Sequence, residues 1–288
     1  HWRKPEGSFV PATVEALIEF ALGKVGQDEK SLTLLQSKSL LPLETPELLR
    51  LVTGLDKNDL VEASERLRQH GVFTGDTFAH PLYRELTLQR LSKEKRQTLA
   101  RRALEFLRSE PVEAVTFLED AKLSTKNALS LLRQAVKCAK ESKNDLQIGK
   151  LLSQMLEYLP KNEQAEVALE AATFLKQVAV AEATRLAARA ASLKRELAPQ
   201  AILLQAELLA IQGHLGEAET LWQKLEPLLS KDAYLTGLVR LRGVAHDYSG
   251  VVQLFESCPE CFTAPDAATT QWIVRGLAQL GQIELARR

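Results

Sequence analysis

The sequence of 288 residues lacks several features that would place it outside the ordinary folded proteins. Its three cysteines are too few for a disulfide framework in a chain of this length, and this scarcity points to a reducing compartment, the cytoplasm. No apolar run comes near the ~18 uncharged residues that a membrane-spanning helix needs, so we expect no membrane insertion. Lys and Arg total 37, as do Asp and Glu, so the whole chain lacks the positive charge of a nucleic-acid binder.

Residues that break helices are scarce too. The chain holds 14 glycines and 11 prolines, and the segments between them place apolar residues at spacings of three and four with little alternation. This pattern predicts an all-α protein. Pro11 and Pro46 stand where first-turn prolines belong, with Thr45 as the expected N-cap before Pro46 and Gly54 as the end of that helix.

One short segment departs from the helical pattern. A helix expected to begin after Asp56 and to end at Gly71 is followed by two short runs of β-branched and aromatic residues on either side of Gly75-Asp76. That arrangement predicts a β-hairpin. Three short helices, a small hairpin and a further helix are the order of a winged-helix domain, which we place at residues 28–90.

Beyond residue 90 the sequence repeats with a period near 34. A small or β-branched residue recurs at one position of each period, namely Gly149, Ala183, Ala218, Val252 and Ala286. Three residues later stands a bulky residue on the same helix face, namely Leu152, Leu186, Leu221 and Phe255. These two recurring positions, one small and one bulky, resemble the tetratricopeptide repeat, in which small and bulky residues meet where paired helices cross.

The period predicts the organisation of the rest of the chain. Residues 91–143 are expected to be connecting helices, and residues 144–288 to form a superhelix of tetratricopeptide-like repeats that is truncated at its C-terminus. The expected helical hairpins bury the small positions and cover residues 144–176, 180–212, 215–245, 248–280 and from 282 onward.

Residues 10 to about 160 resemble a region found downstream of the nucleotide-binding core in regulatory ATPases of the STAND class, which includes large bacterial transcriptional regulators of the LuxR and maltose-activator kind. Four phrases carry the resemblance in order: Val10–Ile18, Thr53–Phe73, Phe78–Glu85 and Leu91–Arg96. The resemblance implies that residues 1–27 are a linker helix from an upstream nucleotide-binding domain, and that the parent protein binds ADP or ATP. The phosphate-loop motif G-x-x-x-x-G-K-[ST] is absent here, so we expect no cofactor in this fragment.

The same resemblance singles out His80. In the family, the matching histidine stands between the last strand of the winged helix and the next helix, where it reaches the phosphates of ADP in the nucleotide-binding domain. An imidazole N–H can bind a phosphate oxygen, and a helix start adds exposed N–H groups. Arg84, one turn later, is a second candidate for this contact in the full-length parent. Position alone favours a simpler role for His80, in which it only satisfies local backbone groups.

A basic stretch invites a nucleic-acid interpretation. Residues 84–110 hold eight basic and four acidic side chains. However, the helix before the hairpin, which would enter the major groove, has a net charge of minus one. We therefore expect no direct DNA binding, and we interpret the basic stretch as a solvated helix face or a surface that docks on another domain.

Cys258 and Cys261 form a C-x-x-C pair, which occurs in zinc sites and redox motifs. No second pair completes a four-ligand zinc site, and the strand-to-helix context of a thioredoxin-like redox motif is missing. We expect two loop thiols and no metal. Phrases such as H-E-x-x-H and G-x-S-x-G are absent, so no catalytic residue is predicted.

With the composition and the absent motifs, the resemblance implies a non-catalytic, cytoplasmic fragment of a signal-transduction ATPase that regulates transcription. Its expected partners are the upstream nucleotide-binding domain and a protein or small-molecule effector on the repeat superhelix. The alternative is a winged-helix DNA-binding protein with an accessory helical domain, which the acidic helix disfavours. A third possibility, a helical-repeat hydrolase, lacks the catalytic phrases.

Overall fold

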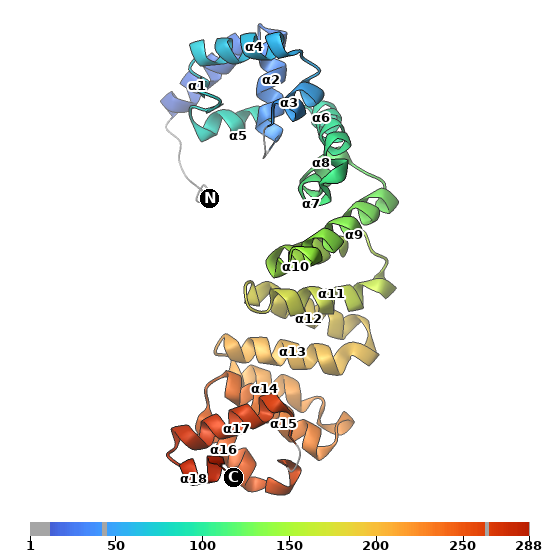
Figure 1. Cartoon of the computed structure of the whole chain (residues 1–288), viewed down its shortest axis with the longest axis vertical. Helices are drawn as coiled ribbons and strands as arrows, with labels where there is room; N and C mark the ends of the chain where they lie inside the picture. Colours follow the sequence, from blue (N-terminus) through green and yellow to red (C-terminus); the bar gives the residue numbers. More distant parts are fainter. Residues whose placement is uncertain (1–11, 42–44, 263–264, 288) are drawn as a thin grey trace. The chain divides into compact units, whose positions relative to one another are not determined.

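The computed structural model describes residues 12–41, 45–262 and 265–287, and within them the chain is all-α apart from one two-stranded sheet (Figure 1). The all-α prediction is thus confirmed. Pro11, expected in a first helical turn, lies outside the described residues. Contacts divide the chain between Leu131 and Leu132 into two units, and each unit is described by itself.

The first part of unit one contains the predicted order of helices and hairpin. Its elements are α1 (Ala12–Val25), α2 (Glu29–Leu40), α3 (Pro46–Thr53), α4 (Lys57–Gln69), β1 (Phe73–Thr74), β2 (Thr77–Phe78) and α5 (Pro81–Arg90). The strands pair antiparallel, with Phe73 opposite Phe78. Their rings meet edge to face, 5.1 Å between centroids. A small core lies inside these elements, formed by Ile18, Leu22, Val25, Leu34, Leu35, Ala63, Leu67, Val72, Phe73 and Leu86.

The helix boundaries follow from the capping residues that the sequence predicts. Oγ1 of Thr45 accepts the N–H of Leu48 at 3.2 Å, and Gly54 ends α3 in the left-handed region with φ 75°. The carboxylate of Asp56 accepts the N–H of Asp59 at 2.8 Å and so starts α4. These side chains satisfy backbone groups that a helix end leaves unpaired.

The second part of unit one is a second helical cluster. It contains α6 (Lys93–Phe106), α7 (Pro111–Ala114), α8 (Leu118–Ala121), two 3₁₀ turns (Leu107–Ser109 and Val115–Phe117) and the beginning of α9 (Thr125–Glu141). Its core joins these helices to α3 through Leu48, Val52, Leu99, Ala100, Ala103, Leu107, Phe117 and Ala121.

Unit two holds the remainder of α9 and nine further helices within the described residues. They are α10 (Asp145–Met155), α11 (Lys161–Leu175), α12 (Val180–Leu193), α13 (Ala198–Ile211), α14 (Leu215–Gln223), α15 (Lys231–Val244), α16 (Tyr248–Ser257), α17 (Ala267–Gln279) and α18 (Ile283–Arg287). From α10 onward, each helix packs against the next one in the chain, which gives a helical repeat-like architecture. The recurring small positions fall in α10, α12, α14, α16 and α18, and the first four are buried.

A three-residue turn recurs in unit two. Its central residue has a positive φ, and the N–H of the following residue donates to a carbonyl five positions back, as in a Schellman motif. The central residues are Lys143, Gly213, His246 and Gly281, and the N···O distances lie between 2.8 and 3.2 Å. This turn joins α9 to α10, α13 to α14, α15 to α16 and α17 to α18.

This turn lies between the hairpins that the period predicts. We expected one hairpin at 180–212 and the next at 215–245, but the tight turn at Gly213 lies between these ranges rather than inside one. It joins α13 to α14. The helices of the expected hairpin at 180–212, α12 and α13, have a longer connection and also pack against each other. A left-handed residue closes a helix with the shortest connection, whereas the other joins are longer. In addition, α13 contacts α15, and α15 contacts α17.

Candidate functional site

His80 lies at the junction between β2 and α5, where it is the N-cap of that helix and is exposed. Its Nδ1 accepts the backbone N–H of Leu82 at 3.2 Å. A ring nitrogen that accepts a hydrogen bond carries no proton, so the neutral imidazole has its N–H on Nε2. Within the described part of the chain, Nε2 has no hydrogen-bond partner. Position and exposure agree with the expectation for this residue, and the local capping role is also present.

Arg84 follows one turn later on α5 and is exposed as well. Its Nε donates to the carbonyl oxygen of Ser39, 2.9 Å away, near the C-terminal end of α2. The same helix buries Leu86 and Thr87. Arg84 therefore fixes α5 against α2, and part of its guanidinium is committed to this structural contact.

The two arginines of α4 are neutralised by acidic side chains. Arg66 pairs with Asp28 at 2.8 Å and with Glu62 at 2.5 Å. Arg68 pairs with Glu65 at 2.7 Å and with Asp76 at 3.1 Å. A helix whose cations are held by carboxylates releases few counterions on meeting phosphate, so this geometry gives no basis for reading DNA with α4.

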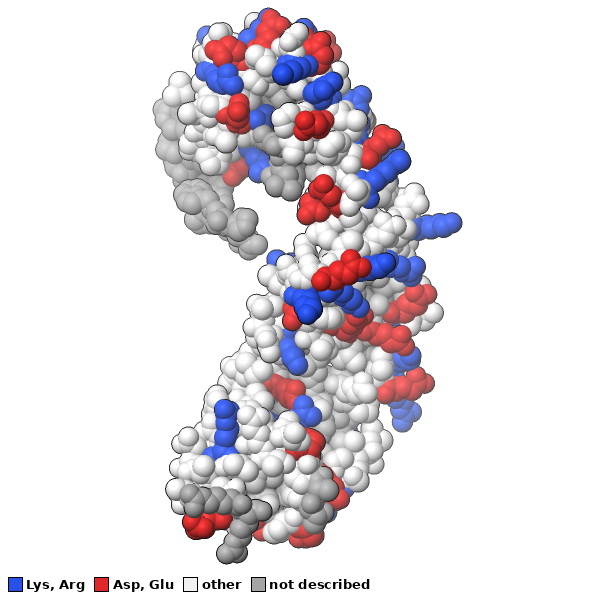
Figure 2. Space-filling model, viewed as in Figure 1, with Lys and Arg blue, Asp and Glu red and all other residues white. Residues whose placement is uncertain are grey.

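The arginines of the basic stretch at 84–110 form more contacts within their own unit than we expected. Each of its six arginines contacts a carbonyl or carboxylate of the same unit: Arg84 with Ser39, Arg90 with Glu19, Arg96 with Leu88 and Asp120, Arg101 with Ala121, Arg102 with Val52, and Arg108 with Glu105. On the face shown in Figure 2, basic and acidic side chains are interspersed in each unit.

Two hollows open beside α3, and sequence reasoning did not anticipate them. One, of about 630 Å³, lies between α2, α3 and α4. The other, of about 500 Å³, lies between α3 and the end of α6. Arg50 borders both, Val61 (62% exposed) borders the first and Leu51 (44% exposed) the second. Exposed apolar side chains beside a cation suit a protein partner better than a phosphate backbone.

Polar pairs connect neighbouring helices in unit two. Glu207 of α13 and Arg240 of α15 approach to 2.5 Å, and Arg242 of α15 contacts Glu219 of α14 at 2.7 Å. Burial raises the pKa of Glu207, although the nearby charge of Arg240 acts in the opposite direction. Glu207 is therefore a partly buried acid on the row of helices α13, α15 and α17.

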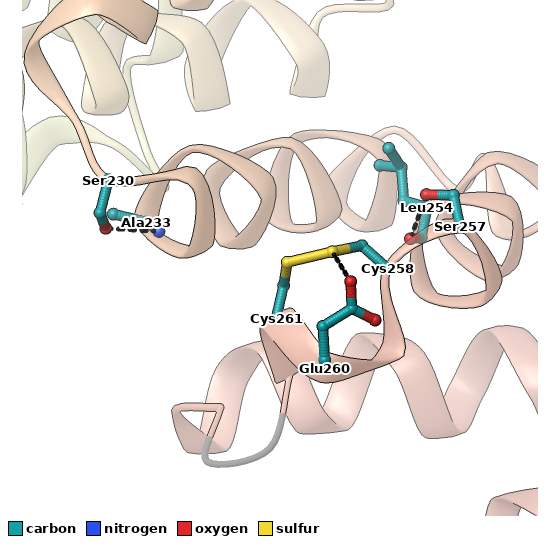
Figure 3. Close-up of a disulfide and its surroundings, with 7 residues drawn as sticks. All are labelled: Ser230, Ala233, Leu254, Ser257, Cys258, Glu260 and Cys261. Carbon is teal, nitrogen blue, oxygen red and sulfur yellow. Dashed lines mark hydrogen bonds between the residues drawn. A yellow bond between two sulfur atoms is a disulfide. The ribbon is translucent and has the colours of Figure 1, made fainter.

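The expectation of two free loop thiols is wrong, because the structure joins Cys258 and Cys261 in a disulfide (Figure 3). The pair spans the 3₁₀ turn Pro259–Phe262, in which residues three apart lie above one another, and the two Cα atoms are 5.5 Å apart. Oε1 of Glu260 lies 3.0 Å from Sγ of Cys258. These three residues are a possible ligand group by distance, but the sulfurs are bonded to each other.

Comparison of the chain with protein-family models, with curated proteins and with solved structures finds no match. Among the described residues, no helix combines the length and apolar character needed to cross a bilayer. The geometry of the described residues is therefore the basis for inferring a function. Of the features that sequence reasoning missed, the disulfide had a visible signal, the C-x-x-C spacing, whereas the hollows beside α3 depend on helix packing and had none.

Proposed function

We propose that this chain is the non-catalytic relay and partner-binding part of a signal-transduction ATPase of the STAND class that regulates transcription. In this proposal, residues 28–90 are its winged-helix-like domain, residues 91–143 connect the domains, and residues 144–288 are tetratricopeptide-like repeats. Two observations support it: the order of three helices, a hairpin and a helix in unit one, and the recurring left-handed turn in unit two.

The observation that carries the proposal is the geometry of His80. The contact with Leu82 fixes the Nε2–H tautomer and leaves that N–H exposed at the start of α5. A hydrogen bond to a charged acceptor contributes about 1.5–3 kcal/mol, which is enough to shift a switch whose two states differ by a few kcal/mol. His80 would thus hold the resting state by donating to ADP in the upstream nucleotide-binding domain, with Arg84 as an auxiliary contact.

The repeats supply the second part of the proposal. Helices α13, α15 and α17 contact one another in succession and so form one continuous side of unit two. Stacked helical pairs present such a side as an extended binding surface. We assign the binding of a protein or small-molecule effector to it, and the partly buried pair of Glu207 and Arg240 gives this surface a polar anchor.

The DNA-binding alternative is less well supported. It requires α4 to meet phosphates, but Arg66 and Arg68 are held by carboxylates. The apolar side chains beside α3, Val61 and Leu51, also favour a protein partner. For the same reason we place the docking of other domains, rather than of DNA, on unit one.

The test separates the two roles of His80 with a matched pair of variants in the full-length parent. His80→Ala removes both the cap and the Nε2 donor, whereas His80→Asp keeps a side-chain acceptor at the N-cap and has no side-chain N–H donor. We expect both variants to retain less ADP through purification and to raise effector-independent activity. If His80→Asp retains ADP like the unchanged protein, His80 is only a cap and the proposal fails.

A further inference from the structure

The disulfide of unit two lies in an unusual setting for a stabilising bridge. It closes a loop over only two intervening residues, and a short loop gains least from closure because the unfolded chain loses little freedom. The same bridge stands in a chain whose few cysteines point to a reducing compartment. A bridge that contributes little stability and forms in such a chain is more readily explained as a reactive pair.

The two sulfurs differ in accessibility. Cys258, at the end of α16, is 2% exposed, whereas Cys261 is half-buried. The carboxylate of Glu260 approaches Cys258, and Figure 3 shows it on the side of that sulfur. An approaching thiolate is negatively charged, so both sterics and charge direct it to Cys261. Phe262, the next residue, is buried against α15 and α16 and holds the turn in place.

We propose that Cys261 is a site of thiol–disulfide exchange with low-molecular-weight thiols. A thiolate of such a compound attacks Sγ of Cys261 and forms a mixed disulfide. The bond between the two protein sulfurs breaks, its electron pair goes to Sγ of Cys258, and that sulfur takes the proton which the attacking thiol released to solvent. A second thiol then attacks the sulfur of the bound small molecule, so that one protein disulfide and two thiols become one protein dithiol and one small disulfide.

Glu260 can accept a hydrogen bond from the thiol of Cys258 when the pair is reduced. A disulfide sulfur carries no hydrogen, but the thiol of Cys258 has one, and Oε1 of Glu260 is already 3.0 Å away. Reduction therefore lets this contact become an S–H···O hydrogen bond, with Cys258 as the donor and Glu260 as the acceptor.

The test uses the whole chain with Cys138, the third cysteine, changed to Ser, so that the pair provides the only cysteines. Added single changes Cys258→Ser and Cys261→Ser leave one thiol each. Both proteins are treated with glutathione disulfide, and adduct formation is followed by intact-mass spectrometry. We expect the chain that retains Cys261 to form the adduct roughly tenfold faster, because exchange rates depend on access to the thiol.

A second measurement needs no change at the pair. The Cys138→Ser chain is treated with reduced glutathione, quenched with acid and digested, and the mixed disulfide is expected on Cys261. Equal or faster adduct formation at Cys258, or a pair that is already reduced after purification in air, would overturn the proposal. Tight binding of one Zn²⁺ by the reduced chain, with exchange blocked, would also overturn it in favour of a metal site.

Discussion

Gly237 of α15 lies so close to Trp222 of α14 that a β-carbon added to this glycine would stand 2.0 Å from Cζ2 of the indole ring. Two other glycines of unit two show the same relationship, Gly243 with Trp272 and Gly149 with Leu175, each at 2.4 Å. A bulky side chain thus occupies the space that a missing side chain leaves on the adjacent helix. The packing of bulky against small residues, predicted from the period, is present here. Gly149 is one of the recurring small positions, but its partner Leu175 and both residues of the other two pairs lie outside the recurring positions.

This relationship predicts that Gly237→Ala destabilises the protein. Alanine favours a helix over glycine by about 1 kcal/mol, but overpacking costs about 1–3 kcal/mol, and the indole cannot easily move because its Nε1 donates to the carbonyl of Tyr234 at 3.0 Å. We expect a lower urea midpoint. The matched control is Gly216→Ala, since the position in α14 has open space around its Cβ and should gain stability. A gain in both variants would contradict the packing argument.

Ala218 tests the recurring small position. It is fully buried in α14, so Ala218→Trp should overpack the crossing and lower the free energy of unfolding by about 1–3 kcal/mol or more. The neighbouring side chain of Glu217 is exposed, and Glu217→Trp should leave the melting temperature nearly unchanged. Calorimetry of both variants checks this, and an unaltered melting temperature for Ala218→Trp would refute the register.

The raised pKa of Glu207 predicts a pH dependence with a definite sign. Because burial raises the native pKa above the unfolded value of 4.5, the native state holds more protons between these two pKa values. Stability from this group is therefore full below the unfolded pKa and is lost as the pH rises through the native pKa. The difference in unfolding free energy between the unchanged chain and Glu207→Gln should fall over that window. A rising difference would show that the attraction of Arg240 dominates.

The ion pairs on α4 predict weak interaction with duplex DNA. We expect at most salt-sensitive binding without sequence preference, because Arg66 and Arg68 are already held by acidic groups. Fluorescence anisotropy at low and at physiological salt measures this, with a scrambled duplex as the control. Binding that is selective and survives added salt would revive the DNA-binding alternative.

Local signals predicted local structure well. Thr45, Asp56 and Gly75-Asp76 each act through neighbouring backbone groups, and the structure places the caps and the hairpin where these residues indicate. The turns at Lys143 and His246 were not predicted, since a left-handed residue is expected to be glycine and neither of these is. The period could therefore be recognised from the recurring small residues, whereas the turns that accompany it could not.

Features that depend on long-range packing were less accessible. The exposure of His80 could be expected from its place between a strand and a helix, whereas the pairing of Arg66 with Asp28 joins residues from two helices. Counting the charges on α4 could not show which carboxylates hold Arg66 and Arg68. The disulfide was misjudged because residues 259–262 had no helical pattern, so the closeness of residues three apart in a 3₁₀ turn was not considered.

The recurring left-handed turn also determines where unit two can tolerate a change of length. A three-residue turn closed by a backbone hydrogen bond has no slack, so one residue inserted next to Gly213 would rotate α14 by about 100° and carry Ala218 toward solvent. The connection at 224–230, with its 3₁₀ turn, is longer and holds no such bond across a left-handed residue. Insertions, and fusions of a reporter domain, are therefore best placed in the longer connections.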